Sequence, residues 1–125
     1  MAKSVITISA RKKMAVARNN GSTIPKIKYI ALGSGGVDAN GEVISPLAEN
    51  VTLNNELIRK EYDKCTKISD TIYQYEICLK NNDLVGEYIS EIALIDEDED
   101  IVAISNFLAQ GKDTTEVTYS INDSY

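Results

Sequence analysis

The feature of this sequence that most constrains its fold is the alternation of apolar and polar side chains in the last half of the chain. In residues 72–79, the apolar members Tyr73, Tyr75, Ile77 and Leu79 occupy every second position. Successive side chains of a β-strand point to opposite faces, so this pattern predicts a strand with one buried face. Similar segments follow at residues 88–95, 101–109 and 117–122, separated by short clusters of turn-forming and acidic residues. Short connections favour antiparallel hairpins over parallel crossover units.

Two more strands are predicted upstream. In residues 27–32, apolar side chains occupy both odd and even positions. This pattern predicts a strand covered on both faces. Residues 59–68 predict another strand, preceded by a short helical turn that begins at Thr52. The glycine cluster at 33–36 and the turn residues at 38–41 indicate consecutive turns or one mobile loop. The glycines lack the spacing and the following helix of a nucleotide-binding loop, so we do not expect a phosphate site.

The N-terminal segment has a different period and predicts a helix. Its apolar residues recur at helical spacing from Ile6 to Ala17, and Thr7 or Ser4 could serve as its N-cap. The residues 19–21, Asn-Asn-Gly, are typical of a helix end. The predicted fold class is therefore α+β and mostly β: an N-terminal helix followed by an antiparallel β meander or sandwich of about six strands.

Charge is distributed unevenly along the chain. Residues 1–28 carry seven Lys or Arg and no acid, whereas residues 29–125 carry six basic and nineteen acidic side chains. At 125 residues the chain suits a single domain over 1–125, with a basic N-terminal helix (1–21) and an acidic antiparallel β body (22–125). Such asymmetry favours contacts between the basic head and an acidic body, either of another subunit or of a partner protein. The candidate interface residues on the helix are Arg11, Lys12, Lys13 and Arg18.

Other partners and most chemistries fit this composition poorly. The basic segment has no interleaved aromatic residues and precedes an acidic body, which argues against nucleic acid. The helix is short and lacks large apolar anchors, and no apolar stretch is long enough for a membrane span or a secretory signal. The chain has no histidine and only two cysteines, Cys65 and Cys78, which we expect to be reduced rather than paired across strands. We therefore expect no enzymatic activity, no cofactor and no metal.

Two groups of carboxylates need separate consideration. The run Asp96 to Asp100 lacks the central glycine of a helix–loop–helix calcium site, and its flanks are strand-like. We therefore expect a solvated hairpin tip. Weak cation binding is the alternative. Glu91 shares a predicted strand face with Ile89, Ala93 and Ile95. A carboxylate on an apolar face needs a partner, either a lysine or backbone amides, so Glu91 is a candidate for a structural or interface role.

Four segments together resemble one protein family. Residues 83–94 are similar to the "dl-G-x-x-isEiGL" core of the phage tail-collar fibre family, although Ala93 stands where the family usually has Gly. The start at Thr7 resembles its "T-x-x-G/A", and residues 29–35 its "i-a-l-G-x-G". Residues 52–59 resemble its "t-x-L-x-x-E-v-x-R", and residues 107–113 its "f-x-x-x-x-KD". The order and spacing match over nearly the whole chain, but the acidic run replaces a shorter "D-x-D-G" hairpin.

The resemblance implies a structural role in a phage or phage-tail-like particle. Members form the N-terminal, baseplate-attaching part of contractile-tail fibres, so we expect a connector between a fibre or peripheral protein and the baseplate. The chain stops at Tyr125, without a shaft or receptor-binding tip, so it is expected to be either a free-standing adaptor or an attachment domain without its fibre. The expected partners are other tail proteins and further copies of the chain, with a homotrimer favoured, assembled in the host cytoplasm without a signal peptide. A stand-alone ligand- or glycan-binding β module is the alternative.

Overall fold

The structure is a computed structural model that describes residues 2–125. It contains one helix and eight strands. In chain order they are β1 (Lys3–Ile6), α1 (Ile8–Asn20), β2 (Ile27–Gly33), β3 (Glu56–Glu61), β4 (Lys64–Ser69), β5 (Ile72–Leu79), β6 (Tyr88–Asp96), β7 (Ile101–Gly111) and β8 (Val117–Ser124). The predicted class, α+β and mostly β, is confirmed, with eight strands instead of about six.

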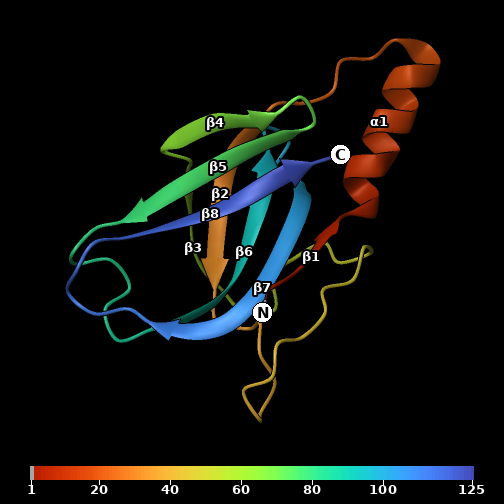
Figure 1. The fold of residues 1–125 in the computed structure, drawn as a ribbon. Coiled ribbons are helices and arrows are strands. Elements are labelled where there is room, and N and C mark those ends of the chain that lie inside the picture. The colour runs from red at the N-terminus through yellow and green to blue at the C-terminus, as the bar shows by residue number, and fades with distance from the viewer. Residues whose placement is uncertain (1) are drawn as a thin grey trace.

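The strands form two antiparallel sheets that pack face to face (Figure 1). The larger sheet has the order β1-β7-β6-β2-β3, and the smaller one the order β4-β5-β8. Neighbours in the sequence pair as hairpins at β2–β3, β4–β5 and β6–β7, whereas β6 also pairs with β2, and β8 with β5. The predicted antiparallel meander or sandwich takes the form of a sandwich, because the chain crosses between the two sheets three times.

Apolar residues cover both faces of the five-stranded sheet. Between the two sheets lie the buried side chains Ile30, Leu32, Ile77, Leu79, Ile89, Ile92, Leu94, Ala103, Tyr119 and Ile121. On the opposite face Ala31, Ala93 and Ile95 pack with Leu53, which belongs to the long loop between β2 and β3. This confirms that β2 is buried on both faces, and it explains why its sequence does not alternate cleanly.

The N-terminal helix begins later than its apolar pattern suggested. Thr7 is the N-cap: its hydroxyl oxygen accepts a hydrogen bond from the Ala10 N–H at 3.2 Å, and Gly21 ends the helix in the left-handed conformation at φ 75°. Ser4 and Ile6 lie instead in β1, which pairs with β7. This strand was not predicted because it is only four residues long, and its place at the sheet edge depends on β7, which is remote in the sequence.

The segment before β5 also differs from its prediction. No helical turn forms at Thr52, and β3 begins at Glu56 because the N–H groups just before it bind a distant carboxylate, described below. Residues 59–68 do not form one strand. The chain breaks at Tyr62 and Asp63, where the Asp63 carboxylate accepts a hydrogen bond from the Cys78 N–H, and β3 and β4 belong to different sheets. Cys65 is exposed and Cys78 half-buried, and both are free thiols.

Candidate protein-interaction site

Helix α1 lies at one margin of the larger sheet, where it contacts β7 (Figure 1). Arg11, Lys12 and Arg18 are all exposed. Arg11 makes only a long hydrogen bond of 3.4 Å to the Ile6 carbonyl. Among the described residues none of the three forms an ion pair, so their charges are available to an external partner.

The same helix face also carries exposed apolar side chains. Ile8 is 38% exposed and Val16 is 49% exposed, and both are one helical turn from Lys12. Exposed apolar side chains next to arginine are common in protein interfaces. We call Ile8, Arg11, Lys12, Val16 and Arg18 the basic helix face.

The fourth predicted basic residue, Lys13, forms ion pairs with carboxylates of its own chain. Its Nζ lies 2.7 Å from Asp96 Oδ2, 2.7 Å from Asp100 Oδ2 and 3.3 Å from Asp98 Oδ2. The acidic run is the turn of the β6–β7 hairpin, and one lysine links that turn to the helix. Part of the attraction between the basic head and the acidic body is thus satisfied within one chain.

The acidic turn is only partly the solvated tip that the sequence suggested. Asp96 is buried, and its Oδ1 accepts hydrogen bonds from the N–H groups of Asp98 and Asp100, which close the turn. Burial tends to lower the pKa of Lys13, but the hydrogen bonds to Asp100, Asp96 and Asp98 outweigh it, and the pKa is raised above its ordinary value. The Lys13 ammonium group therefore lies among the same carboxylates that would be needed to bind a metal cation.

Glu91 lies in the interior, 1% exposed, and does not reach the surface. Its Oε2 accepts hydrogen bonds from the N–H groups of Gly35 and Asn55, each at 2.8 Å, and its Oε1 accepts one from Asn54 N–H at 2.9 Å. Of the two partners that the sequence left open for Glu91, backbone amides are the ones observed. The carboxylate joins β6 to the loop after β2 and to the segment before β3.

The glycine cluster beside Glu91 packs closely against its neighbours. Gly33 and Gly36 are buried, and the Gly36 N–H donates to Ser90 Oγ at 2.9 Å. A Cβ on Gly36 would overlap the Ser90 carbonyl oxygen, and one on Gly33 would overlap the Asn55 carbonyl oxygen and the Glu91 carboxylate. Glycine is required at both positions for space, because the backbone lies too close to β6, and at Gly33 also to the segment before β3, for any side chain.

Two other residues of the motif segments link distant parts of the chain. The Thr7 hydroxyl donates to the Ile101 carbonyl at 2.6 Å, and so attaches the start of the helix to β7. Lys112 is 3% exposed, and its ammonium donates to the carbonyls of Lys80 at 3.0 Å and Asp113 at 2.7 Å. Sequence reasoning did not identify the structural role of Lys112, since a buried lysine can be recognised only from the carbonyls around it.

A sequence model described as "Phage tail-collar fibre protein, N-terminal" matches residues 1–123. The chain belongs to this family. No curated protein and no solved structure matches it. As a member of the phage tail-collar fibre family, the chain is a virion-associated structural protein of the phage tail. Within residues 2–125, the single helix is too short and too polar to cross a membrane.

In this tail-collar fibre protein, the residues that carried the resemblance are mostly structural. Glu91, the glycine loop and the segment before β3 come from three of the motif segments and meet at one carboxylate. Thr7 and Lys112 fasten two further segments. The basic helix face lies outside these contacts and is free to take part in binding.

Proposed function

We propose that this protein connects a tail fibre or a peripheral tail protein to the baseplate, and that the basic helix face docks on an acidic surface of its partner. Membership of the tail-collar fibre family supports the setting. The observation that carries the docking mode is the exposure of Arg11, Lys12 and Arg18 without acidic partners, beside a lysine that is fully paired.

The basic residues of the helix have two different roles, and this difference supports the assignment. Lys13 holds the helix against its own hairpin and so fixes the direction in which the rest of the basic face points. A preoriented charged surface raises the rate of encounter with a surface of opposite charge, and its contribution weakens in salt because mobile ions screen exposed charges. We also propose that the chain acts as a single domain and assembles as a homotrimer.

Charge reversal tests the docking mode. The double variant Lys12→Glu, Arg18→Glu should reduce incorporation into purified tails about tenfold or more, and raising the salt concentration during assembly should weaken incorporation of the wild type. Its matched control, Lys64→Glu with Lys67→Glu, makes the same charge change on the exposed β4 strand and should be incorporated normally. Equal incorporation of both double variants, or assembly that salt does not affect, would refute docking through the basic helix face.

Light scattering of the purified protein tests the oligomeric state separately. A homotrimer has about three times the 13.7 kDa mass of one chain. A stable monomer over the whole accessible concentration range would contradict the trimer without affecting the charge-reversal result.

A further inference from the structure

The two sheets have four edge strands, and three of them carry features that discourage pairing with a further strand. β1 is only four residues long. β3 has charged side chains at four of its six positions, and β4 carries two lysines and an irregular register with β5. Short length, charge and register irregularities are the usual ways in which proteins protect an exposed sheet edge.

The fourth edge strand, β8, is neither short nor irregular, and it carries only one charge. It runs for eight residues, pairs with β5 without a register shift, and contains no lysine, arginine or proline. Its single charged residue is Asp123, and its exposed positions are Thr118, Ser120, Asn122 and Ser124. No strand of the described chain pairs with its other side. Half of the backbone N–H and C=O groups of an edge strand point away from its sheet, and such a row is a template for strand addition.

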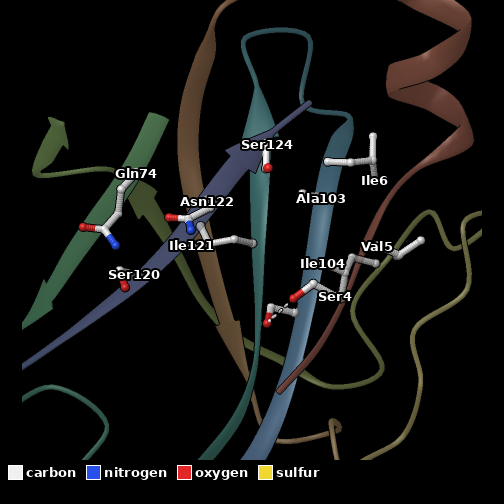
Figure 2. A pocket seen from close by; sticks show the side chains of 11 residues that line it. Ser4, Val5, Ile6, Gln74, Ala103, Ile104, Ser120, Ile121, Asn122 and Ser124 are labelled. Carbon is white, nitrogen blue, oxygen red and sulfur yellow. Dashed lines mark hydrogen bonds between the residues drawn. The ribbon is translucent and has the colours of Figure 1, made fainter. Parts of the chain in front are cut away.

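A groove of about 400 Å³ lies along this unpaired edge. Ser120, Asn122 and Ser124 of β8 line one side, and Ser4, Ile6 and Ala103 of β1 and β7 line the other, as Figure 2 shows. None of the side chains that line the groove carries a charge. The groove therefore suits an uncharged occupant, with an apolar floor for part of its surface and small hydroxyl and amide groups along its rim.

The groove exists because the two sheets differ in size. The smaller sheet has three strands and the larger has five, and β8 crosses over β6 while β7 and β1 extend beyond it (Figures 1 and 2). A fourth strand hydrogen-bonded to β8 would lie over β7 and β1. There it would cover Ile6 and Ala103 and complete the sandwich.

We propose that β8 is a strand acceptor: an extended, uncharged segment of a neighbouring tail protein adds to its free edge and lies in this groove. Backbone hydrogen bonds to β8 supply much of the affinity, and alternate apolar side chains of the segment rest on Ile6 and Ala103. That the donor is a tail protein rests on the proposed function; strand addition itself rests on the groove and the unprotected edge.

A second folded copy of this chain fits the groove less well than a single extended segment. Pairing β8 with the β8 of another copy would bring together the parts of both larger sheets that extend beyond β8. The groove between β8 and β1 has a volume of about 400 Å³, which is too small for another sandwich. An isolated segment meets no such obstruction.

Hydrogen–deuterium exchange tests the proposal on the intact chain, free in solution and in tails purified from the producing host. In the free protein, the amides of residues 117–124 that face the groove should exchange quickly. In tails they should exchange at least about tenfold more slowly, while β3 and β4 show no comparable protection.

Unchanged exchange of β8 in tails that contain the chain would overturn strand addition. Protection that grows with the concentration of the purified protein alone would mean a second copy and would also overturn it. Tails that lack the chain would instead refute the proposed function, and with it the identity of the donor.

A charge placed on the edge gives an independent test. Asn122→Lys puts a lysine on the exposed rim of β8, and Ser69→Lys makes the same change on the opposite edge of the same sheet. Asn122→Lys should lower incorporation into tails about tenfold or more, whereas Ser69→Lys should match the wild type. Melting temperatures check that both variants fold, and Ser120→Lys replaces Asn122→Lys if the latter does not. Wild-type incorporation of the β8 variant would contradict the proposal.

Discussion

At the scale of single residues, the Glu91 side chain connects three segments that are far apart in the sequence. Its carboxylate accepts three backbone hydrogen bonds from two segments that lie 36 to 56 residues away in the sequence. A buried charge of this kind is tolerated because donors surround it, and removing one acceptor leaves a buried donor unpaired at a cost of about 1–3 kcal/mol.

Replacing Glu91 by Gln should therefore destabilise the protein. The single amide oxygen of Gln can take over the two bonds at Oε2, but its NH₂ group would then face the Asn54 N–H, and two donors cannot pair. The free energy of unfolding, measured by urea denaturation, should fall by about 1–3 kcal/mol. Glu87→Gln, at an exposed position of the same segment, is the control and should change stability by less than about 0.5 kcal/mol. Equal stability of the two variants would mean that the Glu91 hydrogen bonds contribute nothing.

At the scale of secondary-structure elements, the attachment of helix α1 to the β6–β7 hairpin depends on Lys13. Its side chain is 24% exposed, whereas that of its partner Asp96 is only 2% exposed. An ion pair with one buried member differs from an ordinary surface pair, since removal of the lysine leaves a buried carboxylate with fewer partners. The helix would also lose its direct link to the hairpin turn.

We expect Lys13→Gln to lower the free energy of unfolding at pH 7 by about 1–2 kcal/mol, with Lys12→Gln as the near-neutral control. The pH dependence follows from the raised pKa of Lys13. Its stabilisation is fully present below the ordinary value of 10.5 and is lost as the pH rises through the higher pKa of the folded state. The difference between the wild type and Lys13→Gln should thus stay constant up to about pH 10 and narrow above it. A difference that vanishes at neutral pH would contradict the role of this contact.

At the scale of the whole molecule, stability depends on closing the two sheets over one apolar layer. Leu94 is fully buried in that layer, on the central strand β6 of the larger sheet. Leu108, on the neighbouring β7, is 54% exposed. Both residues are leucines, but only Leu94 lies in the apolar layer between the sheets.

An aspartate at each of these positions separates burial from chemistry. Leu94→Asp places a carboxylate among aliphatic side chains without a partner, and the loss should exceed about 4 kcal/mol, enough to prevent folding. Leu108→Asp should fold with nearly wild-type stability. Circular dichroism and the melting temperature distinguish the two outcomes. A folded Leu94→Asp variant would show that the core between the sheets is not as described.

Much of the local structure could be predicted because its causes are local. The period-two pattern of residues 72–79 and 117–122 follows directly from the geometry of a strand, and both strands lie where they were expected. Thr7 and Gly21 bound the helix through contacts three or four residues away. The family resemblance in turn indicated the setting in a phage tail, and the match over residues 1–123 confirmed it.

The remaining features depend on contacts between residues far apart in the chain, so no local pattern contains them. Asn54 and Asn55 favour a turn by themselves, but the Glu91 carboxylate draws their N–H groups into the entry to β3. Lys13 looked like one more member of a basic stripe until the fold placed Asp96 beside it, 83 residues away. The order of strands within the two sheets leaves β8 with an open edge over a groove. By itself the sequence determined the strands β5 to β8 and the end of the helix at Gly21, because strand alternation and the helix-ending glycine are local features. Only the tertiary structure decided which charges are satisfied internally and which edge stays open, because distant residues become neighbours only after folding.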